Sequence, residues 1–220
     1  MKYDQILRSG IGGSGNTLVR LILAYLLGDS KVVGTHRYVD DLEESITLTS
    51  GNVGIILPCR DFRSVIASTI RKRKQSPTKQ MIQDTYRIFF TPQYESFHKF
   101  RTEYPRQQDI LRLMYSRFFN DYDYLLDKLQ DFLSITITQQ QRDFVKDRFS
   151  LQSCKDRITL SQLQNWEEVD EQTRLHGNHI GTGLPESWKT FFDPALHKFV
   201  TEMMWAELVE YGYEETGNSV

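Results

Sequence analysis

The length and charge of the chain exclude several classes of protein at the outset. Its 220 residues suffice for one compact domain with a buried core but not for two well-developed ones, so we expect a single domain over residues 1–220. The formal net charge is -2 and both signs are spread along most of the chain, which excludes a long nucleic-acid track and leaves only local anion binding.

Cysteine usage and the apolar segments indicate the compartment. Cys59 and Cys154 lie far apart and show no spacing typical of a zinc site or a disulfide framework. The most apolar stretch, residues 18–27, contains Arg20 and is too short to span a bilayer, and the first ten residues lack the apolar run of a signal peptide. We therefore expect a soluble, cytoplasmic protein in a reducing compartment, without a membrane partner.

The opening of the chain predicts a strand, a tight loop and a helix in that order. A short apolar segment ends at Ile6 and Leu7, and the glycine-rich run SGIGGSG follows at once. Gly28 is a suitable helix stop. Between them, apolar residues recur at helical spacing: Leu18, Leu21, Ile22, Tyr25 and Leu26.

Three further segments are typical of strands. Residues 31–34 are β-rich, residues 52–57 (NVGIIL) form an unbroken apolar run, and residues 110–115 (ILRLMY) form another apolar segment. Unbroken apolar runs suit strands that are buried on both faces of a sheet. We therefore expect these strands to belong to a mostly parallel central sheet.

Helical patterns alternate with these strands. Residues 62–74 carry an apolar side and end in a basic run, 79–104 are rich in aromatic residues that we expect to form core, and 124–133 are amphipathic. Positive charge at the end of a helix suits the helix dipole. The alternation predicts an α/β domain of the P-loop nucleotide-binding type, with the sheet flanked by helices.

The glycine-rich loop has the chemistry of an anion site. Where a buried strand turns through glycines into a helix, backbone amides and the helix N-terminus converge on one point, which suits a phosphate group. We predict that the phosphate is bound by the residues of this loop, namely Gly12, Gly13, Ser14, Gly15, Asn16 and Thr17. The spacing from Gly10 to Thr17 even matches a nucleotide P-loop, except that Asn16 replaces the lysine. That replacement weighs against an ordinary ATPase or kinase.

The sequence from Ile11 to Leu23 resembles the 5′-phosphosulfate loop of the sulfotransferase family. The variant Gly15-Asn16-Thr17, with Arg20 three residues on, occurs in relatives of that family. The resemblance implies a sulfotransferase that moves a sulfuryl group from 3′-phosphoadenosine 5′-phosphosulfate to a hydroxyl or amine of a small-molecule acceptor. No metal ion is expected.

Two further motifs resemble the same family, in the same order. Arg60 ends a predicted buried strand and Ser68 lies eight residues on in a helix, similar to the pair that holds the 3′-phosphate of the donor. Gly34-Thr35-His36 is similar to a lysine-threonine-histidine run whose histidine is the catalytic base. A neutral His36 could accept the proton of an acceptor hydroxyl.

The resemblance continues toward the C-terminus. Tyr115 ends a strand similar to the one whose tyrosine packs against adenine, although it could equally be a core aromatic. The stretch from His176 to Phe192 resembles the late glycine-rich loop that caps the 3′-phosphate. It supplies the candidates Asn178, His179, Gly181 and Gly183, with Trp188-Lys189 as an anchor in which Trp188 packs.

Two cations that the family normally uses are missing. Gly13 and Gly34 stand at the positions of the family's lysines, so another cation should neutralise the leaving phosphate. Arg8, just before the loop, and Arg20, in the following helix, are the nearest candidates and are predicted to act in catalysis.

Two other functions stay open on the sequence alone. A small-molecule kinase or nucleotide hydrolase would use the same loop with magnesium and ATP. A non-catalytic relative would bind the nucleotide after losing the lysines, but would transfer no sulfate.

Overall fold

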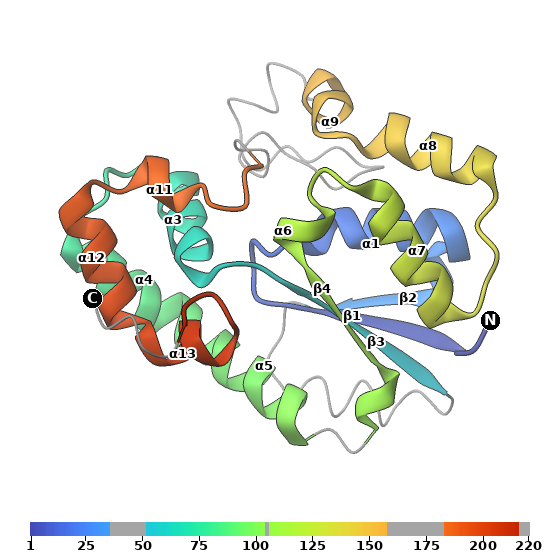
Figure 1. Cartoon of the computed structure of the whole chain (residues 1–220), viewed down its shortest axis with the longest axis horizontal. Helices are drawn as coiled ribbons and strands as arrows, with labels where there is room; N and C mark the ends of the chain where they lie inside the picture. The colour runs from blue at the N-terminus through green and yellow to red at the C-terminus, as the bar shows by residue number, and fades with distance from the viewer. Residues whose placement is uncertain (36–51, 104–105, 158–182, 216–220) are drawn as a thin grey trace.

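The architecture is an α/β fold built on a four-stranded parallel sheet (Figure 1). The computed structural model describes residues 1–35, 52–103, 106–157 and 183–215. The strands are β1 (Gln5–Ser9), β2 (Val32–Thr35), β3 (Val53–Cys59) and β4 (Ile110–Met114). Their order across the sheet is β2-β1-β3-β4, and all three pairings are parallel, so the predicted fold class and the parallel sheet are confirmed.

Strand β3 is the most deeply buried element of the sheet. All seven of its residues are buried, as the unbroken apolar run predicts. It is longer than predicted because β4 continues to pair with it through Pro58 and Cys59 after the pairing with β1 has ended at Ile56. Arg60 therefore leaves the sheet at the carboxyl end of β3.

Each face of the sheet carries its own apolar core. Ile6, Ile56 and Leu113 pack under one group of helices. Leu7, Ile55 and Leu57 point to the other face, since side chains alternate along a strand. The first group comprises α1 (Asn16–Leu27), α7 (Tyr122–Leu133) and α8 (Gln139–Phe149).

The second group of helices comes from the middle and the end of the chain (Figure 1). It comprises α3 (Phe62–Lys72), α4 (Lys79–Thr85), the π-helical segment η2 (Tyr86–Phe90), α5 (Thr91–Glu103), α11 (Trp188–Phe191), α12 (Pro194–Met203) and α13 (Trp205–Glu210). The predicted helix over 79–104 is thus present, interrupted by a π turn. Its aromatic residues do form core, because Phe90 and Phe97 are buried.

Shorter elements connect the main ones. The single-turn helix α6 (Tyr115–Phe118) directly follows β4, and α9 (Leu151–Arg157) follows α8. The 3-10 turns η1 (Asp29–Lys31) and η3 (Gln107–Asp109) precede β2 and β4.

Helix α1 begins and ends at glycines, as predicted. Gly15 is the N-cap at φ 89° and Gly28 follows the helix at φ 85°, where its N–H donates to the Ala24 carbonyl over 2.8 Å. The buried residues of α1 include Val19, Ile22 and Leu23, whereas Tyr25, one of the apolar residues at helical spacing, is 37% exposed. Apolar residues occur on both sides of this helix, so periodicity alone does not fix its rotation.

No helix in the described residues is both long enough and apolar enough to cross a membrane.

Candidate functional site

The glycine-rich loop lies at the carboxyl edge of the sheet, between β1 and α1. Ser9, the last residue of β1, pairs with Thr35, the last residue of β2, so the chain leaves both strands at the same edge. In open parallel sheets this edge is where ligands bind, because the loops that follow the strands converge there.

The loop presents several backbone N–H groups for which the described residues provide no hydrogen-bond partner. In the described part of the chain, no oxygen accepts from the amides of Gly13, Gly15, Asn16 and Thr17. The first turn of α1 contains no acidic side chain that could satisfy them. Free amides at the start of a twelve-residue helix create the positive potential that favours a phosphate or sulfate group.

Gly15 must be glycine for two reasons. Its φ of 89° lies in the left-handed region, and a Cβ atom on it would lie 2.9 Å from the ring of Tyr115. The loop therefore packs directly on α6, which brings Tyr115 next to the predicted anion-binding amides.

Asn16 holds the shape of the loop with its side chain. Its Nδ2 donates to the Gly10 carbonyl over 2.8 Å and to the Ile11 carbonyl over 3.2 Å. Both hydrogens of this amide are thereby used within the loop. The donor that Asn16 can still offer to a ligand is its backbone N–H, and its side chain cannot take the part of the P-loop lysine.

Gln93 is a loop contact that the sequence did not reveal. The Gly12 N–H donates to Gln93 Oε1 over 2.9 Å, and Gln93 Nε2 donates to the Phe89 carbonyl over 3.1 Å. Gln93 lies in α5, 81 positions along the chain from Gly12, and no local pattern distinguishes it. The π turn just before it ends at Phe90 and is tied by the Thr91 hydroxyl, which donates to the Tyr86 carbonyl over 3.0 Å.

Arg8 is a buried cation beside the loop. Arg8 is 3% exposed, and its Nε and Nη1 atoms are buried with no hydrogen-bond partner in the described residues. Burial, reinforced by the charge of Arg20, lowers the pKa of Arg8 to about 10, below the usual range of a guanidinium. The guanidinium is still charged at neutral pH, and a buried charge without a counterion is costly, so its surroundings favour an anion.

Arg20 and Ser14 differ in their surroundings. Arg20 is partly exposed and lies 3.7 Å from the carboxylate of Asp29, which makes it the less suitable of the two predicted compensating cations. Ser14 is 1% exposed and its hydroxyl has no partner in the described residues, so it remains available to a ligand at the loop.

Arg60 joins the loop to a segment from the other end of the chain. Its Nη1 donates to the Gly13 carbonyl over 3.1 Å, and its Nη2 donates to the Leu184 carbonyl over 2.6 Å and to the Ser187 hydroxyl over 3.1 Å. Its Nε is buried without a partner in the described residues. Burial lowers the pKa of Arg60, and none of the carboxylates in the described ranges forms an ion pair with it.

Ser68 and Tyr115 lie next to Arg60 and the loop. A Cβ atom on Gly13 would lie 4.0 Å from the Ser68 hydroxyl, and the Arg60 guanidinium carbon lies 4.7 Å from the centre of the Tyr115 ring. The Tyr115 hydroxyl donates to the Gly183 carbonyl over 2.7 Å, and burial raises its pKa. The structure therefore brings five predicted site positions together: Gly13, Gly15, Arg60, Ser68 and Tyr115.

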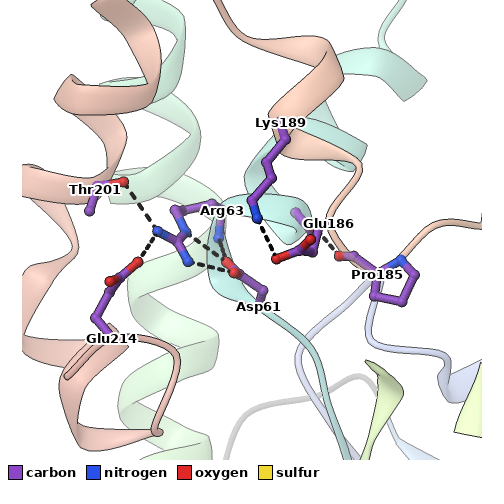
Figure 2. Close-up of polar contacts among 8 residues, drawn as sticks. Asp61, Arg63, Pro185, Glu186, Lys189, Thr201 and Glu214 are labelled. Carbon is purple, nitrogen blue, oxygen red and sulfur yellow. Dashed lines mark hydrogen bonds and ion pairs between the residues drawn. The ribbon is translucent and has the colours of Figure 1, made fainter. Parts of the chain in front are cut away.

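Arg63, one turn after Arg60, has a different role (Figure 2). Its guanidinium bonds the carboxylates of Asp61 and Glu214, and it lies 4.0 Å from the centre of the Trp188 ring. These contacts fix the start of α3 against the C-terminal helices. Trp188 is 7% exposed, so its predicted packing role is confirmed.

Several predicted site residues lie outside the described residues: His36, Asn178, His179 and Gly181. Lys189, the other anchor residue, is exposed and pairs with Glu186 over 2.7 Å (Figure 2). Among the described residues, no group of three His, Cys, Asp or Glu side chains could hold a metal ion.

Comparisons with known proteins agree on the family and on the fold. The family model described as "Sulfotransferase domain" matches residues 23–212. A search of curated proteins finds no match to this chain.

Solved structures of similar fold include a mouse sulfotransferase, SULT7A1, complexed with PAP. It has 15% identity and a TM-score of 0.69, and the match covers 96% of this chain and 88% of that one. Retinol dehydratase with androsterone and the inactive cofactor PAP matches at 14% identity and a TM-score of 0.67, covering 99% of this chain and 82% of that one. The same enzyme with retinol and PAP matches at 15% identity and a TM-score of 0.65, over 100% and 84% of the two chains. Since the family model spans most of its length, the chain belongs to the sulfotransferase family.

Proposed function

We propose that this protein transfers a sulfuryl group from 3′-phosphoadenosine 5′-phosphosulfate to a hydroxyl or amine of a small-molecule acceptor. The observation that carries this proposal is the buried guanidinium of Arg8, whose Nε and Nη1 have no hydrogen-bond partner among the described residues, beside a loop whose amides at Gly13, Gly15, Asn16 and Thr17 also have none there. Such a site stabilises a bound anion and is unfavourable without one. Similar folds have been solved with PAP, which is consistent with this donor.

The described residues divide into two groups around the donor. The amides of Gly13, Gly15, Asn16 and Thr17 and the hydroxyl of Ser14 would bind the 5′-phosphosulfate, and Arg8 would neutralise the charge that develops on the leaving phosphate. Arg60 and Ser68 would bind the 3′-phosphate. Tyr115 is proposed to pack against the adenine.

The reaction is a direct displacement at sulfur. The acceptor oxygen or nitrogen forms a bond to sulfur while the bond from sulfur to the 5′-phosphate oxygen breaks, which releases adenosine 3′,5′-bisphosphate. We propose that His36 accepts the proton from the acceptor. His36 follows Thr35 in the sequence, and Thr35, the last residue of β2, lies at the same sheet edge as the loop.

The rival kinase or hydrolase function is disfavoured by the loop itself. Because the side-chain amide of Asn16 is bonded to Gly10 and Ile11, no side chain at the P-loop lysine position reaches toward β and γ phosphates. A non-catalytic relative that binds the bisphosphate would share the anion site but form no sulfated product.

Thermal unfolding with adenosine 3′,5′-bisphosphate, compared with ATP and magnesium, separates these functions. At a ligand concentration about 100 times its Kd, the bisphosphate should raise the free energy of unfolding by about 2.7 kcal/mol, while ATP with magnesium should not. Stabilisation by ATP and magnesium alone would contradict the proposal. Incubating the protein with the sulfate donor and alcohols, phenols or amines then tests transfer, and bisphosphate binding without any sulfated product would assign the non-catalytic role.

The two proposed roles of His36 and Arg60 predict different kinetic defects. His36→Ala should lower kcat by about 100-fold or more with little change in donor affinity, because the base acts on the acceptor. Arg60→Ala should first weaken binding of the sulfate donor, since it removes a charge-assisted hydrogen bond to that nucleotide. Steady-state kinetics with the donor varied would measure both, and the reverse pattern would overturn these assignments.

A further inference from the structure

The last turn of α3 carries two cations, Arg71 and Lys72, that no carboxylate of the described residues neutralises. Arg71 and Lys72 are both partly buried, and neither forms an ion pair in the described part of the chain. Other partly buried cations of this protein are paired, for example Arg142 with Asp123 and Asp127. The lack of an ion pair at Arg71 and Lys72 within the described residues therefore needs a physical explanation.

These cations lie on the stripe of α3 that faces the candidate site. Ser64, Ser68 and Lys72 are spaced four residues apart, so they lie on one side of the helix. Arg71 lies three residues after Ser68 and therefore belongs to the same side. The Ser64 hydroxyl at the start of this stripe donates to the Pro185 carbonyl over 2.6 Å. The stripe thus faces the segment 184–187, which Arg60 also contacts.

The charges of Arg60, Arg71 and Lys72 act on one another. Burial lowers the pKa of Lys72, and the charges of Arg71 and Arg60 lower it further. Burial likewise lowers the pKa of Arg71. Three positive charges that repel each other destabilise the ligand-free protein, so their proximity favours binding of an anion.

A purely structural explanation accounts for the neighbouring cations but not for these two. Positive charge at a helix C-terminus interacts favourably with the helix dipole, and the charged groups then extend into water. Arg73 and Lys74 fit this description, because both are exposed. Arg71 and Lys72 are partly buried beside another cation, where the dipole is a weak compensation.

We propose that Arg71 and Lys72 complete, with Arg60 and Ser68, the subsite for the 3′-phosphate of the donor nucleotide. This inference rests on the proposed sulfotransferase function. Three of the five N–H donors of Arg60 already bond protein oxygens, which leaves its Nε hydrogen and one Nη1 hydrogen for the ligand. A phosphate monoester carries between one and two negative charges and several acceptor oxygens, so further cations are needed to balance it. Arg71 and Lys72 thereby set the preference for a bisphosphate over a 5′-monophosphate nucleotide.

The test compares two nucleotides on matched variants by calorimetric titration. Arg71→Gln and Lys72→Met should each weaken binding of adenosine 3′,5′-bisphosphate by at least about tenfold, and should change binding of adenosine 5′-monophosphate by less than about twofold. Arg73→Gln, an exposed cation at the same helix end, is the control and should bind both nucleotides as the wild type does. Without ligand, Lys72→Met should unfold at the same or a higher temperature than the wild type, because it removes an uncompensated charge and keeps the apolar stem.

Each outcome decides between the inference and its alternatives. If Arg71→Gln and Lys72→Met bind the bisphosphate as tightly as Arg73→Gln does, or lose both nucleotides equally, the subsite assignment is wrong. Lower stability of ligand-free Lys72→Met would instead favour a structural role. A wild-type protein that binds neither nucleotide would refute the proposed function itself, which is a different result from a wild type that binds and variants that show no selective loss.

Discussion

Arg8 and Arg63 are both buried, yet their guanidinium groups have opposite surroundings. Arg63 contacts two carboxylates, those of Asp61 and Glu214. Arg8 has no carboxylate partner in the described residues, and two of its nitrogens donate to nothing there. A buried charge that is paired within the protein contributes to folding, whereas one left unpaired is explained by a ligand. The two residues should therefore respond differently to the same substitution.

We expect Arg8→Met to leave folding intact and to impair turnover. Removing an unpaired buried charge while keeping an apolar stem should raise stability by about 1 kcal/mol, or a few degrees in Tm. Sulfate transfer should fall by about 100-fold or more, because the leaving phosphate loses its cation. Thermal unfolding and a transfer assay measure the two effects, and turnover close to that of the wild type would show that Arg8 is not the compensating cation.

Arg63→Met is the matched comparison within the same fold. It leaves the carboxylates of Asp61 and Glu214 without their cation, so it should lower the free energy of unfolding by about 3 kcal/mol or more. Chemical denaturation measures this loss. If Arg8→Met were the more destabilising of the two, the division into a structural and a ligand-facing arginine would not hold.

At the scale of whole elements, helix α5 supports the glycine-rich loop from the opposite side to α1. Gln93 accepts from the Gly12 amide and is itself oriented by its bond to the Phe89 carbonyl. The π turn formed by η2 shifts the helix by one residue relative to a regular α-helix, which affects the direction in which Gln93 points. The loop geometry thus depends on an element distant in sequence.

Gln93→Glu tests whether this contact faces the anion. A glutamate can still accept from the Gly12 amide, so the fold should be kept, but its negative charge beside the loop should repel the donor. We expect at least about tenfold weaker binding of adenosine 3′,5′-bisphosphate, measured by titration. Gln93→Met, which removes the contact without adding charge, is the control. Equal affinities for the two variants would mean that the anion does not lie near this helix.

The elements that the sequence predicted well are those set by local patterns. The strand, glycine loop and start of α1 follow from residues adjacent in the chain, and Arg60 lies at the end of an unbroken apolar strand. Gln93 and Ser187 could not be found in this way, because they reach Gly12 and Arg60 across 81 and 127 positions. Contacts between distant segments depend on packing, which leaves no local signal.

At the scale of the whole molecule, the site joins the two ends of the chain across the sheet. Arg60 bonds both Gly13 and the segment 184–187, while the Tyr115 hydroxyl bonds the Gly183 carbonyl. β3 and β4, neighbours in the sheet, end just before Arg60 and Tyr115 respectively. The sheet therefore places these two side chains where they hold the C-terminal segment over the N-terminal loop.

Tyr115→Phe should loosen only one side of this connection. The change keeps the ring that packs on Gly15 but removes the 2.7 Å bond to Gly183, so amide hydrogen exchange in residues 183–187 should speed up by about fivefold to tenfold. Exchange in residues 12–17 should stay close to that of the wild type. Tyr122→Phe is the matched control, because its hydroxyl donates to the Phe149 carbonyl over 2.6 Å elsewhere in the fold. If exchange in residues 183–187 responds equally to both changes, the effect is general softening, whereas a selective response shows that the sheet edge holds the C-terminal segment through Tyr115.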